Sequence, residues 1–255
     1  MTKVSIQMCT YNRAQFIEKA INSVLSQTFK DWELIILDDA STDNTEEIVQ
    51  KYLQDERIKY FKNEQNLGIT RNRNKSLSLS NGEYVAVLDS DDYWIDDNKL
   101  QDQVDFLDSH RDHVLVGTDA IIVNKDDKKI RDRVYEQDDV KIKNKLLTRN
   151  QFFHSSIMYR KNEVIVSGSY DENLPIWEDY DLWLKLGIKH KLGNIHKSMT
   201  AYKVHDNQSD KFKIKSAQYA QRVIINRYHK YYKGYILAII IDVIRNIRTW
   251  LKSLK

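Results

Sequence analysis

The sequence has little cysteine, proline or glycine, with one, one and seven of these residues among 255. With Cys9 alone no internal disulfide can form, and no charged and then apolar leader opens the sequence. We therefore expect a protein of the reducing cytoplasm in which Cys9 is a small buried side chain. Pro175 is the single proline, and no Gly-Ser linker marks a domain boundary.

Two further absences exclude classes of protein. No apolar run approaches the roughly 20 residues that a single membrane-spanning helix requires. No glycine-rich phosphate loop follows the first expected strand, and no Gly-x-Gly-x-x-Gly occurs anywhere. The first absence argues against a single-helix span, and the second against a nucleotidyltransferase or a dinucleotide-dependent oxidoreductase.

The composition favours one main domain with an appendage. Hydrophobic residues make up 41% of the chain, which suffices for one sizeable core or two small ones. The net charge of +3 is unevenly distributed, because residues 211–255 contain 11 Lys or Arg and one acid, Asp242. The tail is therefore near +10 and the rest of the chain near −7. We expect a body over residues 1–208 and a basic tail over residues 209–255.

Apolar residues in this tail recur every three or four positions, which predicts an amphipathic helix. The apolar stripe consists of Ile236, Ile240, Val243, Ile247, Leu251 and Leu254, with Asp242, Arg245, Asn246, Thr249 and Lys252 between them. Basic and aromatic side chains beside such a stripe are typical of a helix that lies on an anionic membrane surface. The alternatives are a helix packed on the body or on a second subunit as a homodimer. Nucleic acid is not the expected partner, although binding of an oligonucleotide by the tail is testable.

An apolar run, residues 84–88, leads directly into three carboxylates, Asp89, Asp91 and Asp92. Adjacent carboxylates suppress one another's ionisation unless a positive charge neutralises them. Oxygen ligands select Mg2+ or Mn2+, and such an ion usually completes its shell with substrate phosphates. The cluster predicts an enzyme with a phosphorylated substrate. The alternative is that these acids cap a helix beginning near residues 96–97.

The order of expected elements predicts an α/β fold. Strands are expected at residues 4–8, 32–37, 58–61 and 84–88, and helices at 14–26, 42–53 and 70–79. This alternation implies a parallel sheet with right-handed crossovers and a ligand at the carboxyl ends of its strands. After about residue 110 the pattern loosens into shorter strands at 114–117 and 120–123 and a helix near 140–147, and this half should shape the second substrate's site.

Several segments occur in the order seen in family 2 glycosyltransferases with the GT-A fold. They are Val4-Ser5-Ile6, Thr10-Tyr11-Asn12-Arg13, Leu25-Ser26-Gln27-Thr28, residues 32–43, Asn66-Leu67-Gly68, Asp89-Ser90-Asp91-Asp92 and Glu178-Asp179-Tyr180-Asp181. The resemblance covers roughly residues 3–208 and is specific as an ordered set, although the Asp-x-Asp motif alone is weak. It implies a Rossmann-like, mostly parallel sheet flanked by helices, with a nucleotide-binding half (1–110) and an acceptor-binding half (111–208).

The resemblance also implies a donor site. It places Asp39 against the imide of uracil, with Asp38 or Tyr11 beside the base, since a carboxylate accepts but does not donate a hydrogen bond. Thr10 is expected to bind the donor substrate as well. A turn and helix cap leading to Thr42 is the alternative for the two acids.

Arg71 and Arg73 lie in the family's loop and helix after Asn66-x-Gly68, where a guanidinium suits diphosphate or ribose oxygens. Arg73, followed by Asn74, better matches the family's Ala-Arg-Asn, although Asn72 replaces the alanine, so the choice between the arginines stays open. Either arginine could instead be a surface cation.

By similarity, Asp89 and Ser90 face the ribose side of the donor, and Asp91 holds the metal, Mn2+ or Mg2+. His205 resembles a late histidine of the family near this metal, although a lone histidine is more often structural. Metal and arginine would together stabilise the charge of the departing nucleoside diphosphate.

Asp179 is the expected general base. A carboxylate at the rigid start of a helix can stay within hydrogen-bond distance of an acceptor hydroxyl. Glu178 would sit beside it at the substrate, and capping alone could explain one of the two acids. His154 and Trp177 are expected on the acceptor side, Trp177 as a stacking face for sugar, although both could be core residues. One base without a nucleophile implies a single displacement that inverts the anomeric carbon.

The resemblance thus implies a metal-dependent, inverting hexosyltransferase that moves a hexose from a UDP-sugar to a glycan or polyprenyl-linked acceptor in cell-surface polysaccharide synthesis. It would act in the cytoplasm, peripherally on the inner face of the cell membrane. The Gln-x-x-Arg-Trp motif of processive synthases is absent, so one sugar is expected per encounter. The competing hypothesis is a non-catalytic sugar-nucleotide-binding or membrane assembly module.

Overall fold

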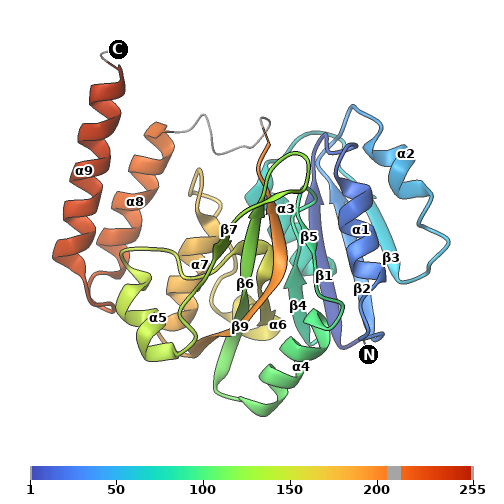
Figure 1. The fold of residues 1–255 in the computed structure, drawn as a ribbon, viewed down its shortest axis with the longest axis horizontal. Coiled ribbons are helices and arrows are strands. Elements are labelled where there is room, and N and C mark those ends of the chain that lie inside the picture. The colour runs from blue at the N-terminus through green and yellow to red at the C-terminus, as the bar shows by residue number, and fades with distance from the viewer. Residues whose placement is uncertain (1, 206–213, 254–255) are drawn as a thin grey trace.

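The computed structural model describes residues 2–205 and 214–253, and it has the GT-A fold that the sequence predicted (Figure 1). The first half is a parallel sheet in the order β3-β2-β1-β4. Its strands are β1 (Val4–Thr10), β2 (Trp32–Asp38), β3 (Ile58–Lys62) and β4 (Tyr84–Val87). The crossover helices are α1 (Ile17–Leu25), α2 (Thr45–Gln50) and α3 (Ile69–Leu79). The apolar runs of the sequence become strands here because both faces of this sheet are covered.

The sheet continues past β4 in the order β8-β6-β9-β5, with β7 paired to β6. These strands are β5 (Tyr93–Trp94), β6 (His113–Val123), β7 (Lys129–Arg133), β8 (Met158–Arg160) and β9 (Lys191–Lys203). In this half, β6 pairs with β9 in parallel and with β7 and β8 in antiparallel fashion. Two short strands were expected where β6 is one strand, and its register against β9 shifts at Thr118, Asp119 and Ala120. A bulge lets a single strand pass through this polar stretch.

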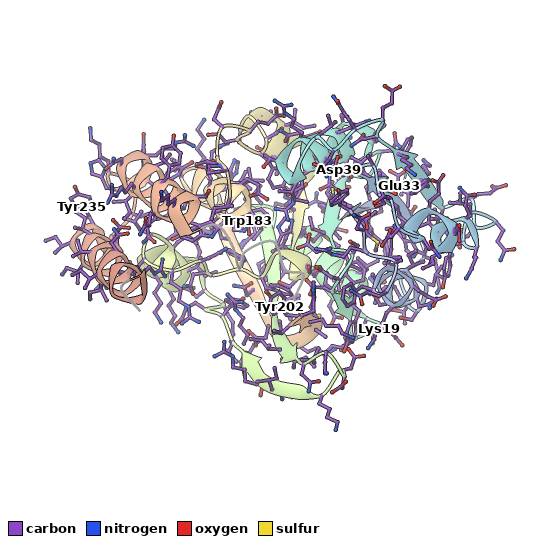
Figure 2. All side chains as sticks on the ribbon, turned by 90° about the horizontal axis from the view of Figure 1, so that it is seen from above. Lys19, Glu33, Asp39, Trp183, Tyr202 and Tyr235 are labelled. Atoms are coloured by element: carbon purple, nitrogen blue, oxygen red, sulfur yellow. The ribbon has the colours of Figure 1, made fainter. Side chains whose placement is uncertain are left out.

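The remaining helices cover the second half of the sheet. They are α4 (Lys99–Ser109), α5 (Asp139–Leu146), the 3-10 turn η1 (His154–Ser156), α6 (Lys161–Val166) and α7 (Glu178–Gly187). One apolar cluster gathers side chains of α7, including Trp183, with those of β8 and α5, while another joins α1 and α4 to β1 and β2. Figure 2 shows Trp183 inside the molecule and Asp39 in the half built on β1 to β4.

The basic tail forms two helices, α8 (Ile214–Tyr228) and α9 (Tyr235–Ser253). The expected boundary at residues 208 and 209 lies outside the described residues, as does Leu254 of the expected apolar stripe. Residues of α8 and the following turn, among them Ile224 and Tyr232, belong to the same buried cluster as Trp183 of α7. Among the described residues, no helix has the length and apolar character needed to cross a bilayer.

Candidate active site

The carboxyl ends of β1, β2 and β4 bring the predicted donor-site residues to one edge of the sheet, as parallel strands must. At the end of β1 the chain turns sharply, with Asn12 in the left-handed region at a φ of 52°. The Asn12 side-chain carbonyl accepts from the backbone N–H of Thr42 at 2.8 Å, which ties the loop after β1 to the loop after β2. The hydroxyl of Thr10 is buried and has no hydrogen-bond partner among the described residues, whereas Tyr11 is exposed.

Asp38 and Asp39 are both buried at the end of β2, and their carboxylates are held differently. Asp38 accepts from the Tyr60 hydroxyl at 2.6 Å and from the backbone N–H of Ser41 at 2.8 Å. Asp39 accepts from the backbone N–H groups of Leu67 at 2.7 Å and Gly68 at 2.9 Å. Asp38 therefore fixes its own turn, while Asp39 anchors the loop that leads into α3 and keeps lone pairs for a further donor.

The structure separates the two candidate arginines of α3. Arg71 lies at the surface, where its Nε is 3.4 Å from Glu172. Arg73 is buried, donates to Glu178 through Nη1, and places Nη2 3.3 Å from Asp89 Oδ1. Residues two apart on a helix point in different directions, so only one of the pair can face the sheet edge. Arg73 thereby joins the Asp-Ser-Asp-Asp segment to the start of α7.

Asp91 is held by two cationic or titratable neighbours. Its Oδ2 accepts from Arg13 Nε at 3.1 Å and lies 3.0 Å from His205 Nε2. Burial opposes ionisation of this carboxyl, but the His205 contact and the Arg13 charge hold its pKa below the ordinary value. The His205 ring in turn lies 4.5 Å from the ring of Phe16, which fixes its orientation. Arg13 was not predicted as a site residue.

Asp92 and Ser155 form a buried latch that sequence reasoning missed. The Ser155 hydroxyl donates to Asp92 Oδ2 at 2.5 Å and accepts from the backbone N–H of Asp89 at 3.1 Å. The other Asp92 oxygen accepts from the backbone N–H of Lys203 at 3.2 Å, two residues before His205. Burial, with the charges of Asp91 and Asp89, raises the pKa of Asp92 well above its usual range. The latch ties the Asp-Ser-Asp-Asp segment to η1 and to β9.

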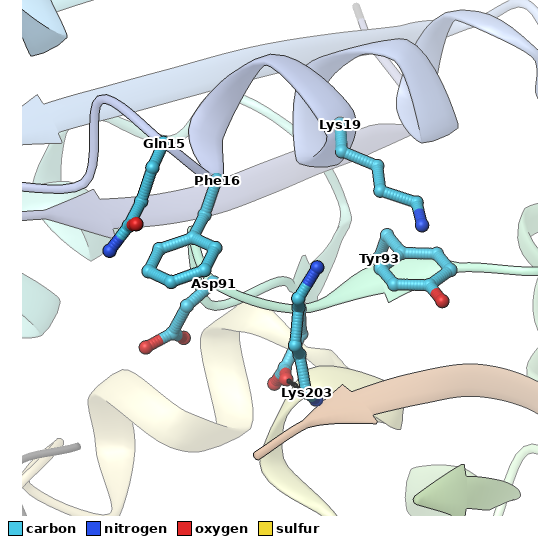
Figure 3. A pocket seen from close by; sticks show the side chains of 7 residues that line it. Gln15, Phe16, Lys19, Asp91, Tyr93 and Lys203 are labelled. Carbon is cyan, nitrogen blue, oxygen red and sulfur yellow. Dashed lines mark hydrogen bonds between the residues drawn. The ribbon is translucent and has the colours of Figure 1, made fainter. Parts of the chain in front are cut away.

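A hollow lies beside Asp91, between α1 and the end of β9 (Figure 3). Phe16 and Lys19 line it from the side of α1, and Lys203 lines it from β9. The Lys19 ammonium lies 3.6 Å from the centre of the Tyr93 ring and 2.8 Å from Asp127. The hollow thus places positive side chains next to the carboxylate segment.

Asp179 stands at the start of α7, next to the Arg73 cluster. Trp177 precedes the helix in the left-handed region at a φ of 65°, which turns the chain so that Glu178 and Asp179 occupy the first helical turn. Burial raises the pKa of Asp179 to about 7, with a further contribution from the Glu178 charge that the Arg73 charge opposes. The backbone N–H of Tyr180 faces the Asp179 carboxyl, but no side chain among the described residues donates a hydrogen bond to it. This carboxyl is therefore available to a substrate hydroxyl and is poised to exchange a proton near neutral pH.

The predicted acceptor-side residues take different positions. His154 is buried in η1, with ring contacts to Tyr170 at 6.3 Å and Trp183 at 6.0 Å. Neither ring nitrogen has a hydrogen-bond partner among the described residues, and burial, aided by the Arg73 charge, lowers its pKa well below the usual range. His154 is thus a neutral ring inside the core. Trp177 is half-buried, and its ring lies 6.4 Å from that of Tyr180.

The donor atoms present suit a divalent cation that is held partly by substrate. Among residues 2–205 and 214–253, no group of three or more His, Cys, Asp or Glu side chains is arranged to hold a metal. Asp91 and His205 offer two adjoining donor atoms, and an ion such as Mn2+ or Mg2+ commonly completes its shell with water and phosphate oxygens. The residues therefore fit the predicted metal.

Comparisons with known proteins agree on the class. The profile of the family described as "Glycosyl transferase family 2" matches residues 5–170. The chain is 32% identical to the Escherichia coli UDP-Glc:alpha-D-GlcNAc-diphosphoundecaprenol beta-1,3-glucosyltransferase WfaP, over 90% of each chain.

Two solved structures share the fold. Residues 1–349 of Staphylococcus aureus TarS, in complex with UDP-GlcNAc, match with a TM-score of 0.74 and 23% identity, over 94% of this chain and 70% of that chain. The Pyrobaculum calidifontis mannosyltransferase PcManGT, in complex with GDP-Man and Mn2+, matches with a TM-score of 0.67 and 15% identity, over 95% of this chain and 73% of PcManGT.

Proposed function

Since the chain belongs to the family 2 glycosyltransferases, we propose that it moves a hexose from a UDP-sugar to a hydroxyl of a glycan or polyprenyl-linked acceptor, with inversion at the anomeric carbon. The pathway would be the synthesis of a cell-surface polysaccharide. The relative WfaP supports this assignment, since its name specifies UDP-glucose as donor and a diphosphoundecaprenol-linked sugar as acceptor.

One observation carries the catalytic part of the proposal. The Asp179 carboxyl has no side-chain hydrogen-bond donor among the described residues, and burial raises its pKa to about 7. A carboxylate in this state can accept the proton of the acceptor hydroxyl as its oxygen attacks the anomeric carbon, while the bond to the diphosphate breaks. A second carboxylate nucleophile is not needed, so one displacement inverts the configuration.

The other residues would bind and orient the donor. Asp39, beside Asp38 and Tyr11, would accept from the uracil imide, and Asp89 with Ser90 would face the ribose. Arg73 would bind the diphosphate. Its contacts to Glu178 and Asp89 hold its guanidinium between the proposed donor site and the proposed general base, Asp179. Asp91 and His205 would hold Mn2+ or Mg2+, which supplies positive charge against the departing diphosphate.

The proposal extends to location and partners. We place nucleotide binding in residues 1–110 and acceptor binding in residues 111–208. A lipid-linked acceptor favours a cytoplasmic enzyme peripheral to the inner face of the membrane, with the basic tail as the contact. A homodimer through the C-terminal helix is the competing use of that tail.

A transfer assay tests the enzyme. The purified protein is offered UDP- and dTDP-sugars with Mn2+ or Mg2+ and a lipid-linked sugar acceptor, with Asp179→Asn and Asp91→Ala as variants. We expect transfer from one UDP-sugar, its loss in Asp179→Asn with UDP binding retained, and loss of metal-dependent UDP binding in Asp91→Ala. Binding of UDP-sugars without any transfer would instead identify the non-catalytic module.

A further inference from the structure

Helix α9 is oriented with its polar side toward the protein. Asp242 is buried and lies 3.6 Å from Arg222 of α8. On the same side, Arg245 donates to the side-chain carbonyl of Gln221, also on α8, and Ala238 is fully buried. The contacts that hold α9 on α8 are therefore largely polar, which is the reverse of an ordinary surface helix.

The opposite side of α9 is apolar and exposed. It carries seven aliphatic side chains with exposed fractions between 39% and 74%: Ile236, Leu237, Ile239, Ile240, Val243, Ile244 and Ile247. We call these seven residues the outer face of α9. Figure 1 shows α9 at the edge of the molecule with α8 between it and α7, and Figure 2 shows Tyr235 at that edge. A continuous aliphatic surface of this kind marks an interaction site.

Cations and aromatic rings border the outer face where α9 begins. In the turn between the two helices, Lys230, Lys233 and Tyr231 are exposed, and Tyr235, the first residue of α9, is exposed too. The exposed fractions of Tyr231 and Tyr235 are 61% and 41%. Aromatic rings and lysines at the edge of an aliphatic face are typical of helices at the boundary between headgroups and acyl chains. Residues 211–255 contain 11 basic residues and one acid, so two copies of this tail would repel each other, whereas an anionic bilayer would attract it.

Helix α8 connects this surface rigidly to the catalytic helix. Arg227 donates to Asp181 of α7 at 2.7 Å, and the Tyr228 hydroxyl donates to the same carboxylate at 2.9 Å. The Tyr232 hydroxyl donates to the backbone carbonyl of Leu184 at 2.6 Å. Asp181 is two residues from Asp179, so the position of α9 is fixed relative to the candidate base.

We propose that the outer face of α9 is a membrane-docking surface that lies in the interface of an anionic bilayer. The aliphatic side chains enter the acyl boundary, and the lysines of the turn meet the anionic headgroups. Because α8 ties α9 to α7, docking holds Asp179 at a fixed height above the bilayer. This last step rests on the proposed function, since it matters only for a lipid-linked acceptor.

Vesicle sedimentation tests the docking. The probes are phosphatidylcholine vesicles with and without phosphatidylglycerol, offered to the full chain and to an Ile236→Ser/Ile240→Ser/Ile247→Ser variant. The control is Ile165→Ser/Val166→Ser, which removes exposed aliphatic side chains from α6. We expect tight binding to the phosphatidylglycerol vesicles, a loss of at least about 100-fold in the α9 variant from three lost aliphatic contacts, and no loss in the control.

Three results would overturn the proposal. These are no vesicle binding by the natural chain, equal binding by the α9 variant, or a dimer in solution that the α9 variant converts to monomer while vesicles are not bound. The transfer assay separates this proposal from the proposed function. We expect the α9 variant to lose transfer to an acceptor embedded in vesicles but to keep transfer to a short, water-soluble acceptor. Vesicle binding without any transfer by the natural chain would refute the enzyme and leave the docking surface intact.

Discussion

Replacement of Asp179 by asparagine changes both the chemistry and the pH dependence of stability. Asparagine keeps the size of the side chain but cannot accept the hydroxyl proton, so we expect transfer to fall by about 100-fold to 10,000-fold, the usual contribution of a general base. In the natural enzyme the transfer rate should rise with pH and level off above a pH of about 7, where Asp179 is ionised. The profile of Asp179→Glu, which retains a carboxyl, should keep such an inflection.

The same pKa also makes the stability of the protein depend on pH. Stability falls over the pH range in which the transfer rate rises. The pKa rises from 3.8 to about 7 on folding, so the folded state favours the protonated form. Stability is greatest below the unfolded pKa and is lost as the pH rises from about 4 to about 7. Each pKa unit corresponds to about 1.4 kcal/mol, so the loss is at most about 4 kcal/mol. Asp179→Asn removes this penalty and should be more stable than the natural protein at a pH of about 8.

Two measurements check this reasoning: a pH series of the transfer rate, and urea unfolding of both proteins across the same range. Asp108→Asn is a suitable control, because the pKa of Asp108 is lowered on folding. Burial raises this pKa, but the hydrogen bonds from Tyr84 and Lys3 outweigh that effect. That control should lose stability at neutral pH. Transfer by Asp179→Asn at the natural rate, or equal pH dependence of unfolding in both proteins, would refute the role assigned to Asp179.

Four further outcomes are expected. Arg73→Lys keeps the charge but loses the fork that spans two carboxylates, so transfer should fall while Arg71→Lys leaves it unchanged. Ser155→Ala removes the donor to the buried Asp92 carboxyl and should cost about 1–3 kcal/mol of stability in urea unfolding, and an unchanged midpoint would contradict the latch. Gly187→Ala places a methyl group against the Tyr232 hydroxyl and should cost about 1–3 kcal/mol. Removal of divalent metal by EDTA should weaken UDP binding in calorimetry, and UDP should strengthen Mn2+ binding by the same factor.

The sequence predicted the first half of the fold well because β1, β2 and β4 are short, largely apolar runs that become buried. Strands β1, β2 and β4 begin at the expected residues. Two short strands were predicted in place of β6, because Thr118 and Asp119 look like a polar break. Asp119 is nevertheless buried, since its carboxylate accepts from the backbone N–H of Tyr135 at 2.9 Å. A partner sixteen residues away is not visible in local periodicity.

For the candidate site, the acidic residues at the strand ends could be predicted from the sequence. The cationic side chains that pair with them could not. The choice between Arg71 and Arg73 depended on which side of α3 faces the sheet. Arg13 follows β1 by three residues, and a search for a cation near the Asp-Ser-Asp-Asp segment could have found it. Ser155 could not be recognised as a site residue from the sequence, because its contact to Asp92 joins residues 63 apart. In α9, periodicity predicted an amphipathic helix but not which side meets the protein.

The charge balance of the site is the physical argument for the proposed divalent cation. Five carboxyl groups, those of Asp89, Asp91, Asp92, Glu178 and Asp179, lie in one connected set of contacts and electrostatic interactions. The side chains with a positive or titratable nitrogen that contact these carboxyl groups directly include Arg13, Arg73 and His205. Lys19 and Lys203 line the hollow beside Asp91, where both also pair with Asp127. Burial and mutual repulsion raise the pKa of Asp89, Asp92 and Asp179, which is how an acidic site without enough positive charge responds. A nucleoside diphosphate adds negative charge to this set, so its binding requires positive charge from a divalent cation or from protonation of these acids. Only the cation leaves Asp179 ionised for proton transfer.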